Sequence, residues 1–142
     1  MPNVPEIADD EILFRHIPGG TTWQAPGPRI TSLNFRPRKV LGETDLSVTR
    51  HCYISADQLL ALVGGDREKG SRVAWVTAGE VRALGLKVEP KPIEPDDPGH
   101  AAIASTESTD LGSQSVQRKL SVLFRFVDND PPPTSTPSNS TA

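Results

Sequence analysis

Residues 72–89 read RVAWVTAGEVRALGLKVE, and this stretch decides the fold. Residues 72–76 are a short apolar run with β-branched and aromatic side chains, which predicts a strand. Thr77 and Glu80 then form a capping box, in which each side chain hydrogen-bonds the backbone N–H of the other residue at the start of a helix. Gly85 is typical of the position just after a helix end. A strand and a short helix therefore follow directly on each other, and the residues after Gly85 predict a further strand.

Other segments of the chain carry strand signals, because they are short runs of apolar and β-branched residues bounded by turn residues. Together with residues 86–89, these predicted strands are Ile12–Ile17, residues 30–36, residues 46–50 and His100–Ala104. A second capping box, formed by Ser55 and Gln58, begins a helix that ends at Gly64.

A last helix is predicted after Ser113, which can cap its first turn. Apolar residues recur every three or four positions along it, which indicates one buried face. That face consists of Val116, Leu120, Leu123, Phe124 and Val127. Arg118 and Arg125 lie on the opposite side, where they can dock an acidic partner, although an ordinary solvated helix face explains the same pair.

The predicted order is three strands, a helix, a strand, a helix, two strands and a helix. Strands that come in runs favour the α+β class over a doubly wound parallel sheet. We therefore expect a single small α+β domain with a mainly antiparallel or mixed sheet and about three helices. The chain has 142 residues, a length that fits one domain.

The two ends of the chain differ in composition from its middle. Residues 1–10 predict a polar, flexible leader, and residues 11–127 form the expected folded domain. Residues 128–142 consist mainly of Pro, Ser, Thr, Asn and Asp. Such a segment buries too little apolar surface to offset the loss of chain entropy on folding, so we expect a disordered C-terminal tail.

The charge and the cysteine content exclude several classes of protein. The net charge is −3 at pH 7, whereas general polyanion binders carry a basic excess. Cys52 is the only cysteine, which excludes a disulfide-stapled secreted scaffold. The first residues lack the basic start and apolar run of a signal peptide, and no segment approaches the roughly 18 apolar residues of a membrane span. We therefore expect a cytoplasmic protein that does not bind a membrane.

The common catalytic motifs are missing from the sequence. It contains no Walker loop, no dinucleotide-binding fingerprint, no G-x-S-x-G elbow, no HExxH, no zinc set of Cys and His, and no EF-hand loop. Their absence argues against the usual nucleotide-hydrolysing, hydride-transferring and metalloprotease classes. We therefore expect no cofactor and no metal site.

Three residues are candidates for catalysis. Residues 96–100, Asp-Asp-Pro-Gly-His, combine two carboxylates with an imidazole where a loop meets a strand. A carboxylate such as Asp97 can orient His100 as a general base, and Asp with His can hold a divalent ion. Arg15, on the first predicted strand, can clamp a pyrophosphate or a carboxylate. An ordinary Pro-Gly turn and a surface Arg explain the same residues.

Residues 36–39, Arg-Pro-Arg-Lys, are the one compact basic cluster in the sequence. Arg36 and Arg38 can bind phosphate groups, and Trp23 nearby can stack on a base or anchor a protein partner. The segment therefore predicts a nucleic-acid or partner site. Charges and Pro also protect an edge strand from pairing with other chains, which explains the same segment.

Several short motifs stand along residues 12–104. They are Leu13-Phe14-Arg15-His16-Ile17-Pro18, Leu46-Ser47-Val48, Thr77-Ala78-Gly79, Arg82, Leu84-Gly85-Leu86 and Pro98-Gly99-His100-Ala101. The chain resembles, in these motifs, a group of small uncharacterised bacterial proteins of unknown function. The resemblance implies a single stand-alone domain from a prokaryote and brings no activity with it.

Arg15 on the first predicted strand, followed by Thr31, Ser32 and Asn34 on the second, resembles part of the ADP-ribosyltransferase fold. In that family an Arg and a Ser or Thr on two strands hold NAD, and a downstream Glu acts on the ribose. The resemblance covers residues 12–35. The Glu would have to be Glu80, Glu89, Glu94 or Glu107, none of which stands in the family's E-x-E turn.

Two classes of function follow from these patterns. The first is a non-catalytic binding or regulatory module with a protein partner, in a bacterial multi-component system of the defence or toxin-control type. The second is a small enzyme that uses Arg15 and Ser32 on NAD, or His100 with Asp96 or Asp97 on a phosphodiester. The enzyme hypothesis requires His100, Asp97 and Arg15 to converge in one cleft.

Overall fold

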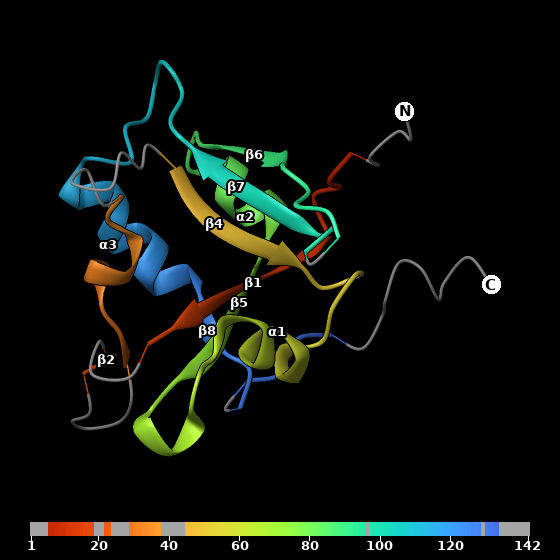
Figure 1. Ribbon diagram of the computed structural model, residues 1–142. Coiled ribbons are helices and arrows are strands. Elements are labelled where there is room, and N and C mark those ends of the chain that lie inside the picture. The colour runs from red at the N-terminus through yellow and green to blue at the C-terminus, as the bar shows by residue number, and fades with distance from the viewer. Residues whose placement is uncertain are drawn as a thin grey trace.

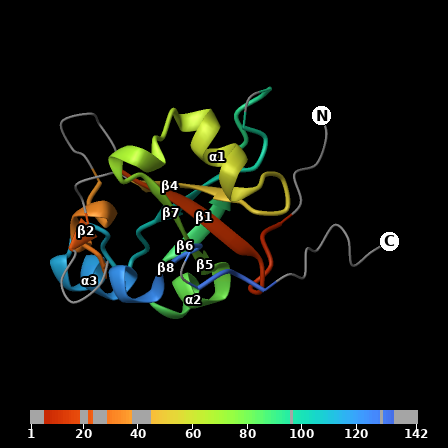
Figure 2. The ribbon, with the colours of Figure 1, turned by 90° about the horizontal axis from the view of Figure 1, so that it is seen from below.

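The computed structural model describes residues 6–18, 22–23, 29–37, 45–95, 97–128 and 130–133. Within them, a six-stranded sheet carries helices on both faces, which confirms the α+β fold (Figure 1, Figure 2). The sheet consists of β1 (Ile12–Ile17), β4 (Asp45–Arg50), β5 (Arg72–Thr77), β6 (Lys87–Pro90), β7 (His100–Ala104) and β8 (Arg125–Phe126). The other elements are α1 (Ala56–Val63), α2 (Ala78–Ala83), α3 (Gln114–Leu123), the 3-10 turns η1 (Ser32–Phe35) and η3 (Arg67–Lys69), and a ribbon of β2 (Thr22–Trp23) with β3 (Arg29–Ile30).

The sheet has the strand order β6-β7-β4-β1-β5-β8, and all neighbouring strands run antiparallel. β1 therefore lies in the interior of the sheet. It pairs with β5 along its whole length, but with β4 only through Leu13 and Phe14. Beyond Phe14 the strands β1 and β4 separate, and this divergence opens the sheet on one side of β1.

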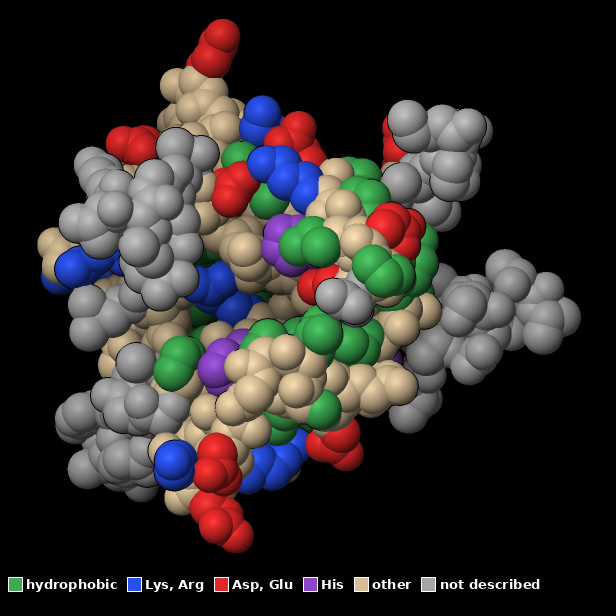
Figure 3. All heavy atoms as spheres, in the orientation of Figure 1, with side chains coloured by type: hydrophobic (Ala, Val, Ile, Leu, Met, Phe, Trp, Pro, Cys, Tyr) green, Lys and Arg blue, Asp and Glu red, His purple; other side chains and the backbone are tan. Residues whose placement is uncertain are grey.

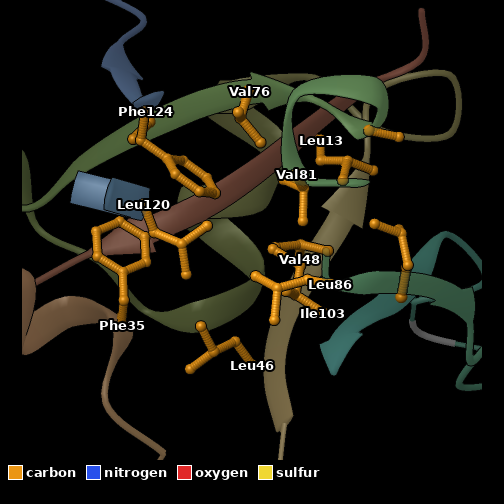
Figure 4. Close-up of a cluster of buried hydrophobic side chains, with 14 of the residues drawn as sticks. Leu13, Phe35, Leu46, Val48, Val76, Val81, Leu86, Ile103, Leu120 and Phe124 are labelled. Atoms are coloured by element: carbon orange, nitrogen blue, oxygen red, sulfur yellow. The ribbon is translucent and has the colours of Figure 1, made fainter. Parts of the chain in front are cut away.

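Apolar side chains fill both faces of the sheet. On one face, residues of β1, β4, β5 and β7 pack against α2, α3 and η1. In Figure 4, Phe35 of η1, Leu120 of α3 and Phe124 lie together, and the two Phe rings have centroids 4.8 Å apart. On the opposite face, Leu59 of α1 packs against Phe14, and Figure 2 shows α1 across the sheet from α2 and α3.

Both predicted capping boxes are present. The backbone N–H of Gln58 donates to the Ser55 hydroxyl at 3.1 Å, and the Gln58 side chain accepts from the Ser55 N–H at 2.8 Å. The same exchange begins α2. Gly64 ends α1 with φ of 70°, and Gly85 follows α2 with φ of 97°, so the predicted ends are confirmed. In the part of the chain that the structure describes, no helix is long and apolar enough to span a membrane.

The predicted strand over residues 30–36 is wrong. Only Arg29–Ile30 forms a strand there, and Ser32–Phe35 forms the 3-10 turn η1. Thr31 and Asn34 explain the difference, because the backbone N–H of Asn34 and its side-chain amide both donate to the Thr31 carbonyl oxygen. Polar side chains that bond to backbone close by in sequence compete with a strand ladder.

The last helix ends earlier than predicted. α3 stops at Leu123, and Arg125–Phe126 form β8 beside β5. Phe124 and Phe126 are both buried in the same core cluster, which is the alternation of an extended chain. Arg125 therefore points to the other face of the sheet, and the predicted pairing of Arg125 with Arg118 on one helix face is wrong.

Residues of the predicted leader contact the folded domain. Ile7 is buried in the main core cluster. The carboxylate of Asp9 accepts a hydrogen bond from Arg82 at 2.8 Å. The described part of the leader is thus packed on the domain, while residues 1–5 lie outside the described residues.

The beginning of the predicted tail also makes contacts. Asp128 accepts a hydrogen bond from Arg67 at 2.7 Å. The carbonyl oxygen of Asp130 accepts the indole N–H of Trp75. These contacts hold the chain against β5, and the predicted disorder of residues 134–142 lies outside the described residues.

Candidate ligand-binding groove

The divergence of β1 and β4 opens into a groove with a volume of about 640 Å³. Its lining comes from β4 and the start of β7 on one side, α1 on the other, β1 between them, and the chain after η1. Figure 3 shows this face hollowed near its centre, with histidine and Lys or Arg side chains around the hollow.

Arg15 is held at the point where the two strands separate. Its Nη1 donates to the carbonyl oxygen of Ser47 on β4 at 2.6 Å. Its Nε and Nη2 donate to the carbonyl oxygen of Asn34 in η1 at 3.0 and 2.6 Å. The Arg15 Cζ atom also lies 5.7 Å from the ring centroid of Phe35. These contacts fix the guanidinium in the wall of the groove.

Arg36 directly follows η1 and lines the same groove. Its side chain is exposed, and no hydrogen bond or ion pair to another described residue engages it. Asp45 also lines the groove, but its carboxylate accepts a hydrogen bond from Lys91 Nζ at 2.7 Å. That bond raises the pKa of Lys91 above its ordinary value, so the Asp45 charge has a cationic partner at the rim.

His100 begins β7, opposite Thr49 of β4. Its Nδ1 lies 2.9 Å from the carbonyl oxygen of Lys91. Because a carbonyl only accepts hydrogen bonds, Nδ1 carries the hydrogen, and Nε2 of the neutral ring keeps a lone pair. No described residue forms a hydrogen bond with Nε2. His100 is therefore set to accept a hydrogen bond or a proton from a ligand.

Asp97 sits in the turn that leads into β7. Its backbone exchanges two hydrogen bonds with Ile93, at 2.9 and 2.7 Å, and its carbonyl oxygen accepts the N–H of His100 at 3.1 Å. The carboxylate accepts the hydroxyl of Thr49 at 3.3 Å. Asp97 and His100 therefore share one end of the groove. Asp96, the second predicted carboxylate, lies outside the described residues.

His16 lines the groove from β1. Its Nε2 lies 3.2 Å from the hydroxyl of Ser71. Burial first, and then the positive charge of Arg15, lower the pKa of His16 below its ordinary 6.5. The imidazole is thus neutral at pH 7, so it adds a polar group but no charge to the groove.

Apolar side chains form part of the groove lining. Leu59 and Val63 line it from α1, and Phe14 lines it from the sheet. Leu59 and Phe14 are buried, whereas Val63 is 46% exposed. Small-molecule sites combine such an apolar lining with a few polar groups that orient the ligand.

Of the catalytic and binding residues predicted from the sequence, Arg15, Arg36, Asp97 and His100 line this groove. The three candidate catalytic residues thus meet in one cleft, although they come from β1, the turn before β7, and β7 itself. Arg36 adds part of the predicted basic cluster to the same cleft.

Two of the other predicted binding residues, Arg125 and Arg118, lie outside the groove lining. Arg125 donates both Nη groups to Glu80, so its charge is engaged. Arg118 is exposed on α3 and does not line the groove. Arg38 and the side chain of Trp23 lie outside the described residues.

Sequence reasoning missed the contribution of β4. Asp45, Ser47 and Thr49 all line the groove, and they alternate with Leu46 and Val48, which are buried in the core. Polar residues at every second position are the signal of a strand with one polar face. That signal was available in the sequence, but it did not say which other strand the polar face adjoins.

The groove has two chemically different ends. Arg15 and Arg36 bring positive charge and the exposed Arg36 presents N–H donors, whereas Asp97 and the Nε2 of His100 present acceptors. Within the described ranges, no group of three or more Cys, His, Asp or Glu side chains could hold a metal ion. The arrangement can bind an anion at one end and hydrogen-bond donors at the other.

Comparison with known proteins does not assign the chain to a family. The chain matches no family model, no curated protein and no solved structure. The resemblances to small bacterial proteins and to the ADP-ribosyltransferase fold therefore stay predictions from the sequence.

Proposed function

We propose that the protein is a binding module that holds a small anionic molecule in the groove between β4 and α1. The observation that carries this proposal is the pair of guanidinium groups at one end of the groove. Arg15 is fixed there by backbone carbonyls, and Arg36 is exposed beside it without an ion pair to any described residue. An Arg side chain presents a fork of N–H donors that matches carboxylate and phosphate.

The size of the groove fits this role. Its volume of about 640 Å³ lies within the range of roughly 300–1,000 Å³ found for small-molecule sites. The described acidic residues that line it are Asp45, which is paired with Lys91, and Asp97, which lies with His100. Arg36, which no described acidic residue engages, is therefore available to an anionic group of the ligand.

Titration with inorganic pyrophosphate tests the proposal. Isothermal calorimetry should detect binding to the full chain, and R36Q should weaken it about tenfold, because a hydrogen bond to a charged group contributes about 1.5–3 kcal/mol and 1.4 kcal/mol is tenfold in affinity. R118Q is the matched control, since it removes the same charge from an exposed site outside the groove and should leave the affinity unchanged. No binding, or equal losses in R36Q and R118Q, would overturn the proposal.

A small enzyme is the second candidate function, and the fixed tautomer of His100 favours it. With Nδ1–H bound to Lys91, Nε2 can take a proton from water as the water oxygen attacks phosphorus and the bond from phosphorus to the leaving oxygen breaks. Hydrolysis of a chromogenic phosphodiester, and of NAD, by the full chain tests this candidate. H100N should abolish turnover, because Asn keeps a donor for Lys91 but has no group at Nε2. Equal turnover in wild type and H100N would remove the candidate.

A protein partner in a multi-component system is the regulatory part of the proposal. α3 is the surface that supports it, because Arg118 and Val122 lie one turn apart, and Val122 is 82% exposed. Purification of the tagged chain from its native host, with and without nuclease, should yield a stoichiometric protein that V122D no longer retains. A partner that V122D still binds, or one that nuclease releases, would contradict the use of α3.

A further inference from the structure

We propose that the anionic ligand of the groove is a nucleotide. The inference rests on the proposed function and adds the chemical class of the ligand. It follows from three kinds of lining in one groove: cationic side chains, apolar side chains and hydrogen-bond acceptors. A nucleotide carries a phosphate, a flat base with an apolar face, and amino or ring N–H donors on the edge of that base.

The acceptor end favours a ligand that carries hydrogen-bond donors, which a simple anion lacks. The Nε2 of His100 can only accept while the ring is neutral, because Nδ1 carries the hydrogen that is bound to Lys91. The carboxylate of Asp97 is likewise an acceptor, and Thr49 already donates to one of its oxygens. An inorganic anion has no donor for these groups and would be repelled by Asp97. An exocyclic amine or a ring N–H of a base supplies the missing donor.

The two ends are separated along β4. The Ser47 carbonyl holds Arg15, whereas Thr49 holds Asp97 and pairs with His100. Two residues along a strand span about 6.6 Å. A phosphate and a base are likewise separated by the ribose that joins them, so one nucleotide can reach both ends.

The apolar part of the lining distinguishes a nucleotide from a sugar phosphate. Leu59 and Val63 face the groove from α1, and Val63 keeps 46% of its surface exposed. A base covers such a surface with its flat face, whereas a sugar phosphate presents hydroxyl groups that would lose water without a partner there. The combination therefore favours a ligand with a base over ribose phosphate alone.

Calorimetric titration of the full chain with AMP, GMP, CMP, UMP, ribose 5-phosphate and pyrophosphate tests the inference. At least one nucleotide should bind tenfold or more tightly than ribose 5-phosphate. H100N should remove that advantage, so that in this variant the nucleotide binds no more tightly than ribose 5-phosphate. H51N is the matched control, because the Nδ1 of His51 also lies near a backbone carbonyl oxygen, that of Ile54 at 3.4 Å, and His51 does not line the groove.

The outcomes separate this inference from the proposed function. If pyrophosphate and ribose 5-phosphate bind in an Arg36-dependent way and no nucleotide binds more tightly, the nucleotide inference is overturned while anion binding stands. If a nucleotide binds tightly and H100N has no effect beyond that of H51N, the assignment of the acceptor end is overturned. If none of the six compounds binds, both proposals fall.

Discussion

Arg125 donates two hydrogen bonds to the carboxylate of Glu80, at 2.9 and 2.6 Å, and so ties the last strand to the first turn of α2. The Cζ atom of Arg125 also lies 4.5 Å from the ring centroid of Trp75. Glu80 is at the same time the N3 residue of the capping box with Thr77. The Glu80 carboxylate therefore caps the start of α2 and also binds Arg125 of β8, which in turn lies against the Trp75 ring.

Replacement of Glu80 by Gln should separate these roles. Gln still caps α2, but it loses the charge that Arg125 binds, so we expect a loss of about 1 kcal/mol. The Arg125 hydrogen bonds lower the pKa of Glu80 below its ordinary 4.5, so the stabilisation is full above that pH and is lost as the pH falls through the lower folded-state value. Urea unfolding of wild type and E80Q should differ at pH 7 and converge in acid. A difference that persists in acid would contradict this assignment.

His16 should make the protein less stable as the medium becomes mildly acidic. Burial and the charge of Arg15 lower its pKa, so the unfolded chain binds a proton near pH 6.5 that the folded chain does not. Stability is therefore full above pH 6.5 and falls as the pH drops below it. H16Q keeps a group that can hydrogen-bond Ser71, and its urea midpoint should change less between pH 7.5 and 5.5 than that of wild type. Equal changes would contradict the prediction.

Glu11 and Arg50 form a buried ion pair, with side chains that are 6% and 3% exposed. Removal of one partner leaves the other charge buried and unpaired, which costs about 3–5 kcal/mol. We expect R50M to lower the free energy of unfolding by this amount. D9N is the control, because it removes the Asp9–Arg82 pair, in which Asp9 is 77% exposed, and should cost less than about 1 kcal/mol. Similar losses in R50M and D9N would contradict the distinction.

Gly64 and Gly85 offer a second matched comparison. Both have positive φ, but a methyl group on Gly64 would meet no atom within 4 Å, whereas one on Gly85 would lie 2.2 Å from the Thr109 hydroxyl oxygen. G64A should cost about 1–2 kcal/mol for the left-handed backbone alone. G85A should cost more, and the excess should shrink when Thr109 is also replaced by Ala. Equal costs for the two glycine variants in thermal unfolding would show that Thr109 moves aside freely.

The helix ends were predictable because their signals are local. Each capping box needs two side chains three positions apart, and Ser55 with Gln58 and Thr77 with Glu80 supply them. The errors arose where local signals compete. Thr31 and Asn34 bond to each other and turn the chain inside a strand-like sequence. Phe124 fits an apolar helix face as well as a strand, and only the pairing of β8 with β5 decides between them.

The candidate site was predictable in its members but not in its assembly. Arg15, Asp97 and His100 stand out by residue type, because side chains of these types commonly bind a ligand or take part in proton transfer. Their meeting depends on the pairing of β1 with β4 and of β4 with β7, which are contacts between segments far apart in the chain. The polar face of Ser47 and Thr49 is visible in the sequence only as an alternation, and its place beside Arg15 comes from the early separation of β1 and β4.

The interior position of β1 also has a consequence for biosynthesis. β1 is the first strand of the sheet to leave the ribosome, yet its longest partner, β5, follows only after β4 and α1 have been made. Pairings across such long stretches of chain slow folding. The nascent chain therefore cannot complete the pairing of β1 with β5 until residue 77 has emerged. Translation that stops before residue 125 omits β8 and leaves one side of β5 as an open edge to which another chain can add.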